Sequence, residues 1–247
     1  MRKILITGVT GGIGSALAEN LLSKNYGVIG LCRNINDKVK SLINENPDNF
    51  FVQECDLMNV ESIPDLLKNL ISTYGSLGGF VHCAGFDKLS PITRAKLDDI
   101  KNLWTIHALV PMIINSVLCK KNFHDENNTS IVLISSQAAH EGAMGHSYYA
   151  SAKGALEGYL PPAAAELMEK NIRLNIVSLA PIKTNMFENW FSMLTEDSKK
   201  KLSDSYPLGM GKVSDAVNLI EFLLSEDSRF INGQIITADG GHSVRKI

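Results

Sequence analysis

An apolar strand that ends in a glycine-rich turn and leads directly into a helix constrains the fold of this chain most. The run from Lys3 to Thr7 is short and apolar, which is typical of a strand buried in a parallel sheet. Residues 8–14 then read GVTGGIG, and residues 15–22 resemble a helix. Glycines permit close backbone approach, and a helix N-terminus offers free N–H groups to an anion. The arrangement predicts a dinucleotide pyrophosphate as ligand, with a turn that binds nothing as the alternative.

Strand-like and helix-like segments alternate along the rest of the chain. Further strands are expected at residues 27–32, 50–54, 79–83, 131–136, 173–179 and 234–238, and the main helices at 60–74, 95–121, 148–170 and 213–225. This alternation predicts one α/β domain over residues 1–247, with a doubly wound (Rossmann-type) parallel sheet of about seven strands and helices on both faces. Residues 185–205 are polar and punctuated by aromatics, so we expect a substrate lid around 185–211, or else a plain solvated helix.

Composition excludes several other classes of protein. The net charge of −2 gives no support for nucleic-acid binding. No apolar run reaches the ~18 residues that suggest a membrane span. The cysteines are widely spaced, which favours buried thiols in a reducing, cytoplasmic setting over a disulfide framework. No spacing of His, Cys and Asp suggests a metal site.

Three polar residues are expected to meet where the strand 131–136 ends. Ser136 lies at the end of that strand, and Tyr149 and Lys153 are four residues apart on one face of the next helix. A nearby cation favours the phenolate and lowers a tyrosine pKa. Lys153 would therefore make Tyr149 an acid–base group for a substrate oxygen, with Ser136 holding that oxygen by a hydrogen bond.

The end of the second strand predicts which dinucleotide is bound. About 20 residues after the glycine turn, NAD enzymes usually carry an acidic residue for the ribose 2′-hydroxyl. Cys32 occupies this place and Arg33 follows it. A guanidinium binds a 2′-phosphate through charge-assisted hydrogen bonds, so NADP(H) is favoured over NAD(H). The alternatives are an ordinary surface arginine, or Asp37 as a late-placed ribose ligand.

With these residues in place, the chain resembles the short-chain dehydrogenase/reductase family from end to end. Ser136, Tyr149 and Lys153 stand at the family's catalytic spacing, and the C-terminal motifs at 206–209 and 239–241 resemble its 3-oxoacyl-carrier-protein reductase and sugar or steroid dehydrogenase branches. The resemblance implies cofactor contacts from the glycine turn, the adenine pocket, the fourth strand, the catalytic pair and the nicotinamide segment: Gly8, Thr10, Gly12, Ile13, Gly14, Arg33, Asp56, Leu57, Ala84, Gly85, Tyr149, Lys153, Pro181, Ile182 and Thr184.

The resemblance also implies an activity and its partners. A hydride would pass between the nicotinamide and a carbonyl or alcohol substrate, such as a 3-oxoacyl thioester, a sugar or a steroid-like ketone. The protein would act in the cytoplasm on a small molecule, as a homotetramer or homodimer, without nucleic acid or membrane. The alternatives are a dehydratase or epimerase of nucleotide sugars, which are usually longer, and a non-catalytic dinucleotide sensor or scaffold, which typically lacks Tyr or Lys.

Four departures from the family pattern stand out. The family's Asn-Asn-Ala-Gly is replaced by His82-Cys83-Ala84-Gly85, and the segment after Pro181 is two residues shorter. Pro161-Pro162 lies in the helix that commonly builds the subunit interface. His107 replaces the asparagine that helps hold a water in the proton relay. We expect His107 either to stay neutral and hydrogen-bond as asparagine would, or to exchange protons with the relay.

Overall fold

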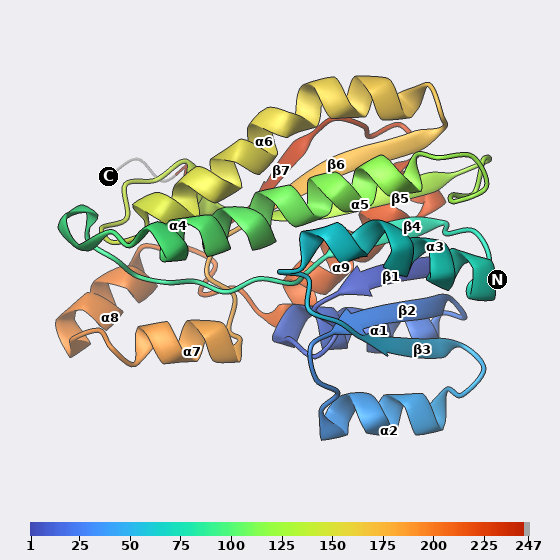
Figure 1. Cartoon of the computed structure of the whole chain (residues 1–247). Helices are drawn as coiled ribbons and strands as arrows, with labels where there is room; N and C mark the ends of the chain where they lie inside the picture. The colour runs from blue at the N-terminus through green and yellow to red at the C-terminus, as the bar shows by residue number, and fades with distance from the viewer. Residues whose placement is uncertain (245–247) are drawn as a thin grey trace.

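A parallel seven-stranded sheet forms the centre of the computed structural model, which describes residues 1–244 (Figure 1). In that part of the chain the strand order is β3-β2-β1-β4-β5-β6-β7, and the paired strands are parallel. The strands are β1 (Lys3–Thr7), β2 (Gly27–Cys32), β3 (Phe50–Glu54), β4 (Gly79–His82), β5 (Thr129–Ser136), β6 (Ile172–Leu179) and β7 (Ile235–Ala238). The order reverses between β1 and β4, and such a switch point is where open α/β sheets bind ligands.

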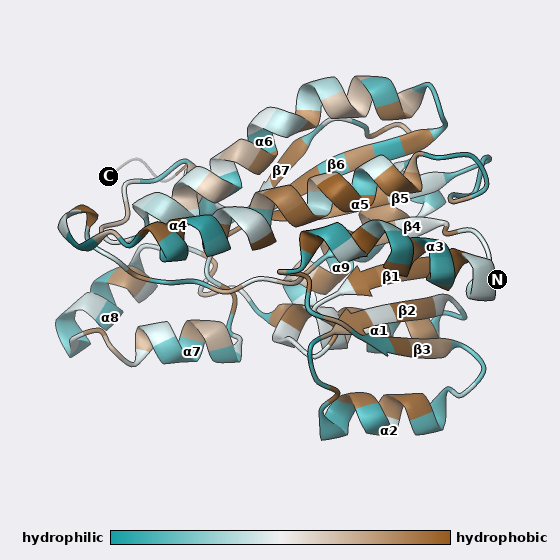
Figure 2. Ribbon diagram, viewed as in Figure 1, coloured by the Kyte–Doolittle hydropathy of each residue, from teal (hydrophilic) through white to brown (hydrophobic). Residues whose placement is uncertain are grey.

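Helices cover both faces of the sheet, which confirms the predicted doubly wound fold. One face packs against α1 (Gly12–Ser23), α2 (Asp37–Glu45) and α9 (Val213–Leu224), and the other against α3 (Ile63–Tyr74), α5 (Val110–Leu118) and α6 (Ser147–Met168). The short turns are η1 (Val60–Ser62), η2 (Ile92–Arg94), η4 (Gln137–Ala139) and η5 (Glu226–Ser228). The strands consist of the apolar runs from which they were predicted, and most of their arrows are therefore brown in Figure 2.

The helical segment expected at 95–121 contains a π-helical turn. It consists of α4 (Leu97–Trp104), the π turn η3 (Thr105–Leu109) and α5, and His107 lies on the turn. Pro111 has no N–H to donate to the carbonyl of residue 107, so an undistorted α-helix would lack a hydrogen bond here. Such π turns are frequent at functional sites.

Two short helices lie beyond the carboxyl ends of the strands. These are α7 (Asn185–Phe191) and α8 (Glu196–Asp204), which stand apart from the two helical layers (Figure 1). Thr184 caps α7 by accepting a hydrogen bond from the Phe187 N–H at 3.4 Å. Among the described residues, no helix combines the length and apolar character that crossing a membrane requires.

Candidate active site

The glycine turn after β1 is packed so closely that side chains would not fit. Gly8 has a φ of +68°, and a Cβ there would lie 2.7 Å from the backbone of Ala84. A Cβ on Gly14 would lie 2.3 Å from the Gly8 carbonyl oxygen, and one on Gly12 would lie 2.8 Å from Thr184. No side chain caps the N-terminus of α1. Its N–H groups therefore face an open cradle that suits a pyrophosphate.

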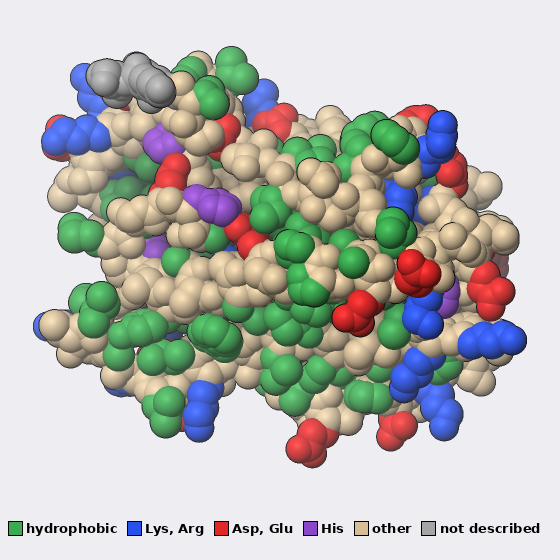
Figure 3. All heavy atoms as spheres, turned by 90° about the horizontal axis from the view of Figure 1, so that it is seen from above, with side chains coloured by type: hydrophobic (Ala, Val, Ile, Leu, Met, Phe, Trp, Pro, Cys, Tyr) green, Lys and Arg blue, Asp and Glu red, His purple; other side chains and the backbone are tan. Residues whose placement is uncertain are grey.

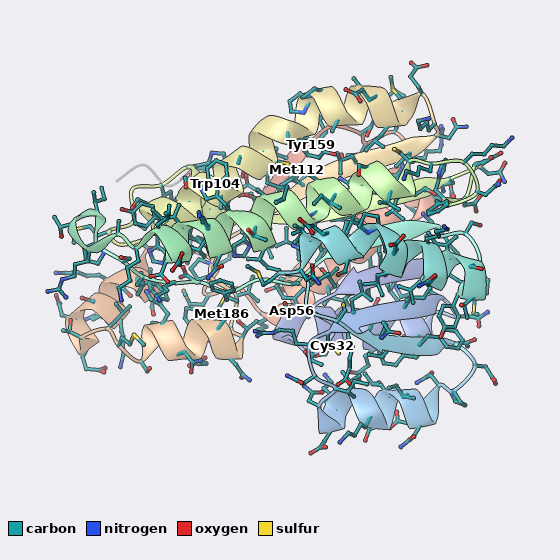
Figure 4. The ribbon with its side chains drawn as sticks, viewed as in Figure 1. Cys32, Asp56, Trp104, Met112, Tyr159 and Met186 are labelled. Carbon is teal, nitrogen blue, oxygen red and sulfur yellow. The ribbon has the colours of Figure 1, made fainter. Side chains whose placement is uncertain are left out.

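The residues predicted for the adenosine half lie at the carboxyl ends of β2 and β3. Arg33 is exposed and has no hydrogen bond or ion pair within residues 1–244. Glu54, paired with Cys32 across β2 and β3, accepts the Ile35 N–H at 2.8 Å. Asp56 is exposed, and Figure 4 labels it near Cys32.

Three of the predicted cofactor contacts also have local structural roles. Asp56 accepts the N–H of Met58 at 2.9 Å, while Leu57 is buried beneath it. Thr10 accepts a hydrogen bond from Asn36 through its carbonyl oxygen at 3.3 Å. None of these residues predicted for the adenosine half lines the cleft that holds the catalytic candidates.

A cleft of about 310 Å³ brings together the predicted catalytic and nicotinamide residues. Tyr149 hydrogen-bonds Ser136, and the ammonium of Lys153 lies 5.6 Å from the centre of the tyrosine ring. Lys153 donates to the Ile134 carbonyl oxygen at 2.6 Å, which anchors its side chain across the end of β5. The predicted residues that line the same cleft are Ile13, Ala84, Gly85, His107, Pro181, Ile182 and Thr184.

Burial dominates the charge states of the catalytic pair. It raises the pKa of Tyr149, with a further rise from the charge of Asp87, and the hydrogen bond with Ser136 acts in the opposite direction. This net direction is opposite to the sequence expectation, because desolvation of the phenolate outweighs the stabilisation that a neighbouring cation gives. Burial also lowers the pKa of Lys153 to about 8. Tyr149 is therefore held as a neutral phenol, the form that a proton donor needs.

His107 lies against the catalytic tyrosine as a buried, neutral imidazole. Its Nε2 donates to the Phe86 carbonyl oxygen at 2.7 Å, and its ring meets that of Tyr149 edge-on at 5.1 Å. Burial, followed by the charge of Lys153, lowers the pKa of His107 well below its usual value. Its Nδ1 is buried without a hydrogen-bond partner within the described residues, so it is a vacant acceptor next to the site.

His82 also departs from the family pattern, and it has a structural role. Its Nδ1 accepts from the Thr7 hydroxyl at 2.8 Å, and that hydroxyl oxygen accepts from the Ala84 N–H at 3.2 Å. Its Nε2 donates to the carbonyl oxygen of Ile106, on the π turn, at 2.8 Å. Burial lowers the pKa of His82 to about 3, so the ring is a neutral link between β1, β4 and η3.

The structure adds polar groups that sequence reasoning did not single out. Asp87 and His146 pair at 3.0 Å on the substrate side of the cleft. Behind Lys153, buried Glu157 accepts from the Ser135 hydroxyl at 2.5 Å and pairs with His140 at 2.8 Å. The i+4 spacing from Lys153 was the only sequence signal for Glu157. In Figure 3 several histidine side chains lie next to acidic ones toward the left of the view, and further acidic side chains are spread over the rest of that face.

Comparison with known proteins decides the family. Residues 8–243 match the family model described as "Enoyl-(Acyl carrier protein) reductase". The chain is also 31% identical to L-xylulose reductase of Caenorhabditis elegans over 245 residues, covering 98% of this chain and 96% of that one. It belongs to the short-chain dehydrogenase/reductase family. As a member of this family, the protein is an oxidoreductase.

Other members of the family are similar over nearly the whole chain. The 3-oxoacyl-[acyl-carrier-protein] reductase FabG of Rickettsia felis is 31% identical, covering 96% of this chain and 95% of that one. The solved structure of ElxO with NADP bound is 26% identical, with a TM-score of 0.87 and 99% of each chain covered. 4-Hydroxyisoleucine dehydrogenase complexed with NADH is 28% identical, with a TM-score of 0.90 and 100% of each chain covered. The family thus includes both dinucleotides and several substrate classes.

Proposed function

We propose that this protein is an NADP(H)-dependent reductase of small carbonyl compounds that also catalyses the reverse alcohol oxidation. The observation that carries the proposal is the convergence of Tyr149, Ser136 and Lys153 in a cleft that adjoins an open, glycine-walled cradle. The glycine turn and uncapped α1 fit a dinucleotide phosphate, and Pro181, Ile182 and Thr184 would border its nicotinamide half. When bound, the cofactor supplies a hydride to the carbonyl carbon.

The side chains of the cleft supply the proton and the orientation. Ser136 holds the carbonyl oxygen by a hydrogen bond, and the neutral phenol of Tyr149 gives that oxygen its proton. Lys153 stabilises the negative charge left on the tyrosine oxygen, and the Ile134 carbonyl keeps its ammonium in place. In oxidation the same groups act in reverse.

The protonation of Lys153 predicts how reduction depends on pH. The pKa of Lys153 is lowered to about 8, so its positive charge is present below that pH and is lost as the pH rises through it. kcat/KM for reduction should therefore fall above about pH 8. A pH series with a carbonyl substrate and saturating NADPH measures this fall. If kcat/KM of the Lys153→Arg protein fell above pH 8 in the same way, the fall could not be assigned to Lys153.

Arg33 is proposed to select NADPH over NADH. Arg33→Ala should weaken NADPH binding by about 1.5–3 kcal/mol, the usual value of a hydrogen bond to a charged group, or roughly 10–150-fold. NADH binding should change little, because NADH has no 2′-phosphate. Titrations of both cofactors measure the two effects, with Asp37→Ala as the matched control for the competing ribose ligand. Equal affinity of the unaltered protein for both cofactors would rule the selection out.

His107 is proposed to accept a hydrogen bond from relay water through Nδ1. The groups that face it are Tyr149 and Lys153 on α6 and His82 on β4, and burial together with the charge of Lys153 keeps the ring neutral. His107→Asn retains an acceptor and should keep kcat within about threefold, whereas His107→Leu should lose about tenfold, the value of one hydrogen bond.

The pH dependence separates this role from proton exchange by His107. kcat profiles of the unaltered protein and His107→Asn should have the same shape from pH 5 to 8, measured with a substrate whose chemistry is rate-limiting. An ionisation present only in the unaltered protein would show that the imidazole itself titrates in the relay.

Residues 185–211 are proposed to form a lid over the cleft. Met186, Phe187, Trp190, Leu202 and Tyr206 line the cleft from this segment, which supports the lid. We also propose that the protein is a homodimer or homotetramer, because the family resemblance implies an oligomer. Analytical sedimentation would measure the oligomeric state.

Oxidation of NADPH with a panel of neutral carbonyls tests the function as a whole. Turnover that requires Tyr149 supports the reductase. Tight NADPH binding with no turnover of any carbonyl would favour a dinucleotide sensor.

A further inference from the structure

The substrate side of the cleft carries two carboxylates and no lysine or arginine that is free to bind a substrate. Asp87 and Glu141 both line it. Of the Lys and Arg side chains in the described part of the chain, only Lys153 lines the cleft. Its ammonium donates a hydrogen bond to the Ile134 carbonyl oxygen and lies beside the ring of Tyr149. A phosphate or carboxylate on the substrate would therefore lose its hydration without gaining a lysine or arginine partner.

Asp87 has one unused oxygen, in a pair whose histidine lies beside the proton donor. Its Oδ2 pairs with His146 Nε2 at 3.0 Å, while its Oδ1 is buried without a hydrogen-bond partner within residues 1–244. The His146 ring lies 6.3 Å from that of Tyr149. A buried carboxylate oxygen without a donor is costly, so a substrate that donates a hydrogen bond here gains affinity.

The pairing with His146 also decides what kind of donor fits. The hydrogen bond with Asp87 raises the pKa of His146 and favours the charged imidazolium. The Asp87–His146 pair is then close to neutral as a unit, and the imidazolium repels an incoming ammonium. A hydroxyl group donates to Asp87 without a charge of its own, so it suits the site better than an amine.

The lining of the cleft has a polar part and an apolar part. Glu141 hydrogen-bonds Gln137 and pairs with His242 at 3.2 Å, and the Tyr206 hydroxyl donates to Gln137 at 3.2 Å. These groups satisfy one another and form a fixed wall.

The apolar wall comes from α7. Trp190 and Phe187 contact each other with their ring centres 5.9 Å apart, and Trp190 lies 6.1 Å from His146. Figure 4 labels Met186 on the same helix. An apolar aromatic face beside hydrogen-bond acceptors matches a short carbon chain that carries both C–H bonds and hydroxyls.

Building on the proposed reductase function, we infer that the substrate is a small, neutral, hydroxylated ketone or aldehyde of the ketose type. Its hydroxyl, next to the carbonyl, donates to Asp87 Oδ1 while Tyr149 protonates the carbonyl oxygen. Acyl thioesters that carry phosphates and keto acids are disfavoured because the described cleft has no lysine or arginine free to bind them, and amino ketones are disfavoured by the His146 imidazolium. Asp87 is thus the residue that determines specificity.

Steady-state NADPH oxidation with matched carbonyls tests the inference. The probes are xylulose, which is hydroxylated; butane-2,3-dione, which lacks hydroxyls; acetoacetate and acetoacetyl-coenzyme A, which are anionic; and aminoacetone. We expect xylulose to exceed both anionic probes and aminoacetone in kcat/KM by about tenfold or more. Asp87→Ala should lower the ratio of kcat/KM for xylulose to that for butane-2,3-dione by about tenfold, mainly through KM, as for one lost hydrogen bond.

A second variant separates charge from hydrogen bonding and from folding. Asp87→Asn has the same shape, keeps an acceptor oxygen and removes the charge, so acetoacetate should gain relative to xylulose. A ratio unchanged in both variants, or a wild-type preference for an anionic or amino substrate, would overturn the inference. Loss of NADPH oxidation with every carbonyl, butane-2,3-dione included, would instead contradict the proposed function itself.

Discussion

Tyr149→Phe is expected to lower kcat for carbonyl reduction by about 10²–10⁴-fold, the usual contribution of a placed acid–base group. The substitution removes only the hydroxyl. Tyr149 is half-buried, hydrogen-bonds Ser136 and is held neutral by a raised pKa, so it is the group in the cleft with a proton to give. Single-turnover oxidation of bound NADPH measures the chemical step directly.

NADPH affinity is the control for this variant. It should stay nearly unchanged, because the ring that packs against His107 is retained. Tyr148→Phe is the matched substitution: the Tyr148 hydroxyl donates to the Ile92 carbonyl oxygen at 3.3 Å and is absent from the cleft lining. A Tyr149→Phe protein that keeps most of its single-turnover rate would remove Tyr149 from the role of donor.

Gly14→Ala is expected to destabilise the protein by about 1–3 kcal/mol, the usual cost of overpacking, and to weaken dinucleotide binding. The new methyl group would lie 2.3 Å from the Gly8 carbonyl oxygen, so the turn after β1 must move away from α1. Denaturant unfolding of the free protein measures the first effect, and NADPH titration measures the second.

A glycine elsewhere in a helix gives the opposite expectation. Gly158 on α6 is exposed, and a Cβ there would have no atom within 4 Å. Gly158→Ala should therefore stabilise the protein by about 0.5–1 kcal/mol, because alanine loses less backbone entropy in a helix. Gel filtration should show that both variants keep the oligomeric state. Equal stability of the two variants would show that the turn is not tightly packed against α1.

The fold could be predicted because its signals are local. Each buried strand is a short apolar run that ends at a turn, and the helices between the strands have their own periodicity. The meeting of Ser136 with Tyr149 was predictable for the same reason, since one strand end and one helix face place both residues. The parallel order of the sheet then brings the glycine turn of β1 to the same edge.

The remaining features depend on contacts between distant residues. Asp87 and His146 are 59 positions apart and lie in loops, so no periodicity connects them. The raised pKa of Tyr149 follows from burial by several elements together, whereas the sequence showed only the neighbouring lysine. The π turn at His107 had one local signal, Pro111, but a proline in the first turn of a new helix has the same appearance.

The π turn also determines which side of α5 faces the sheet. A π turn closes its hydrogen bonds over five residues instead of four, so it accommodates one additional residue without breaking the helix. One residue corresponds to about 100° of rotation in an α-helix. Without that residue, the buried positions Val110, Ile114 and Val117 would rotate away from the core. The residue count between α4 and α5 is therefore a constraint on the fold, and the same π turn supplies the Ile106 carbonyl oxygen that accepts from His82.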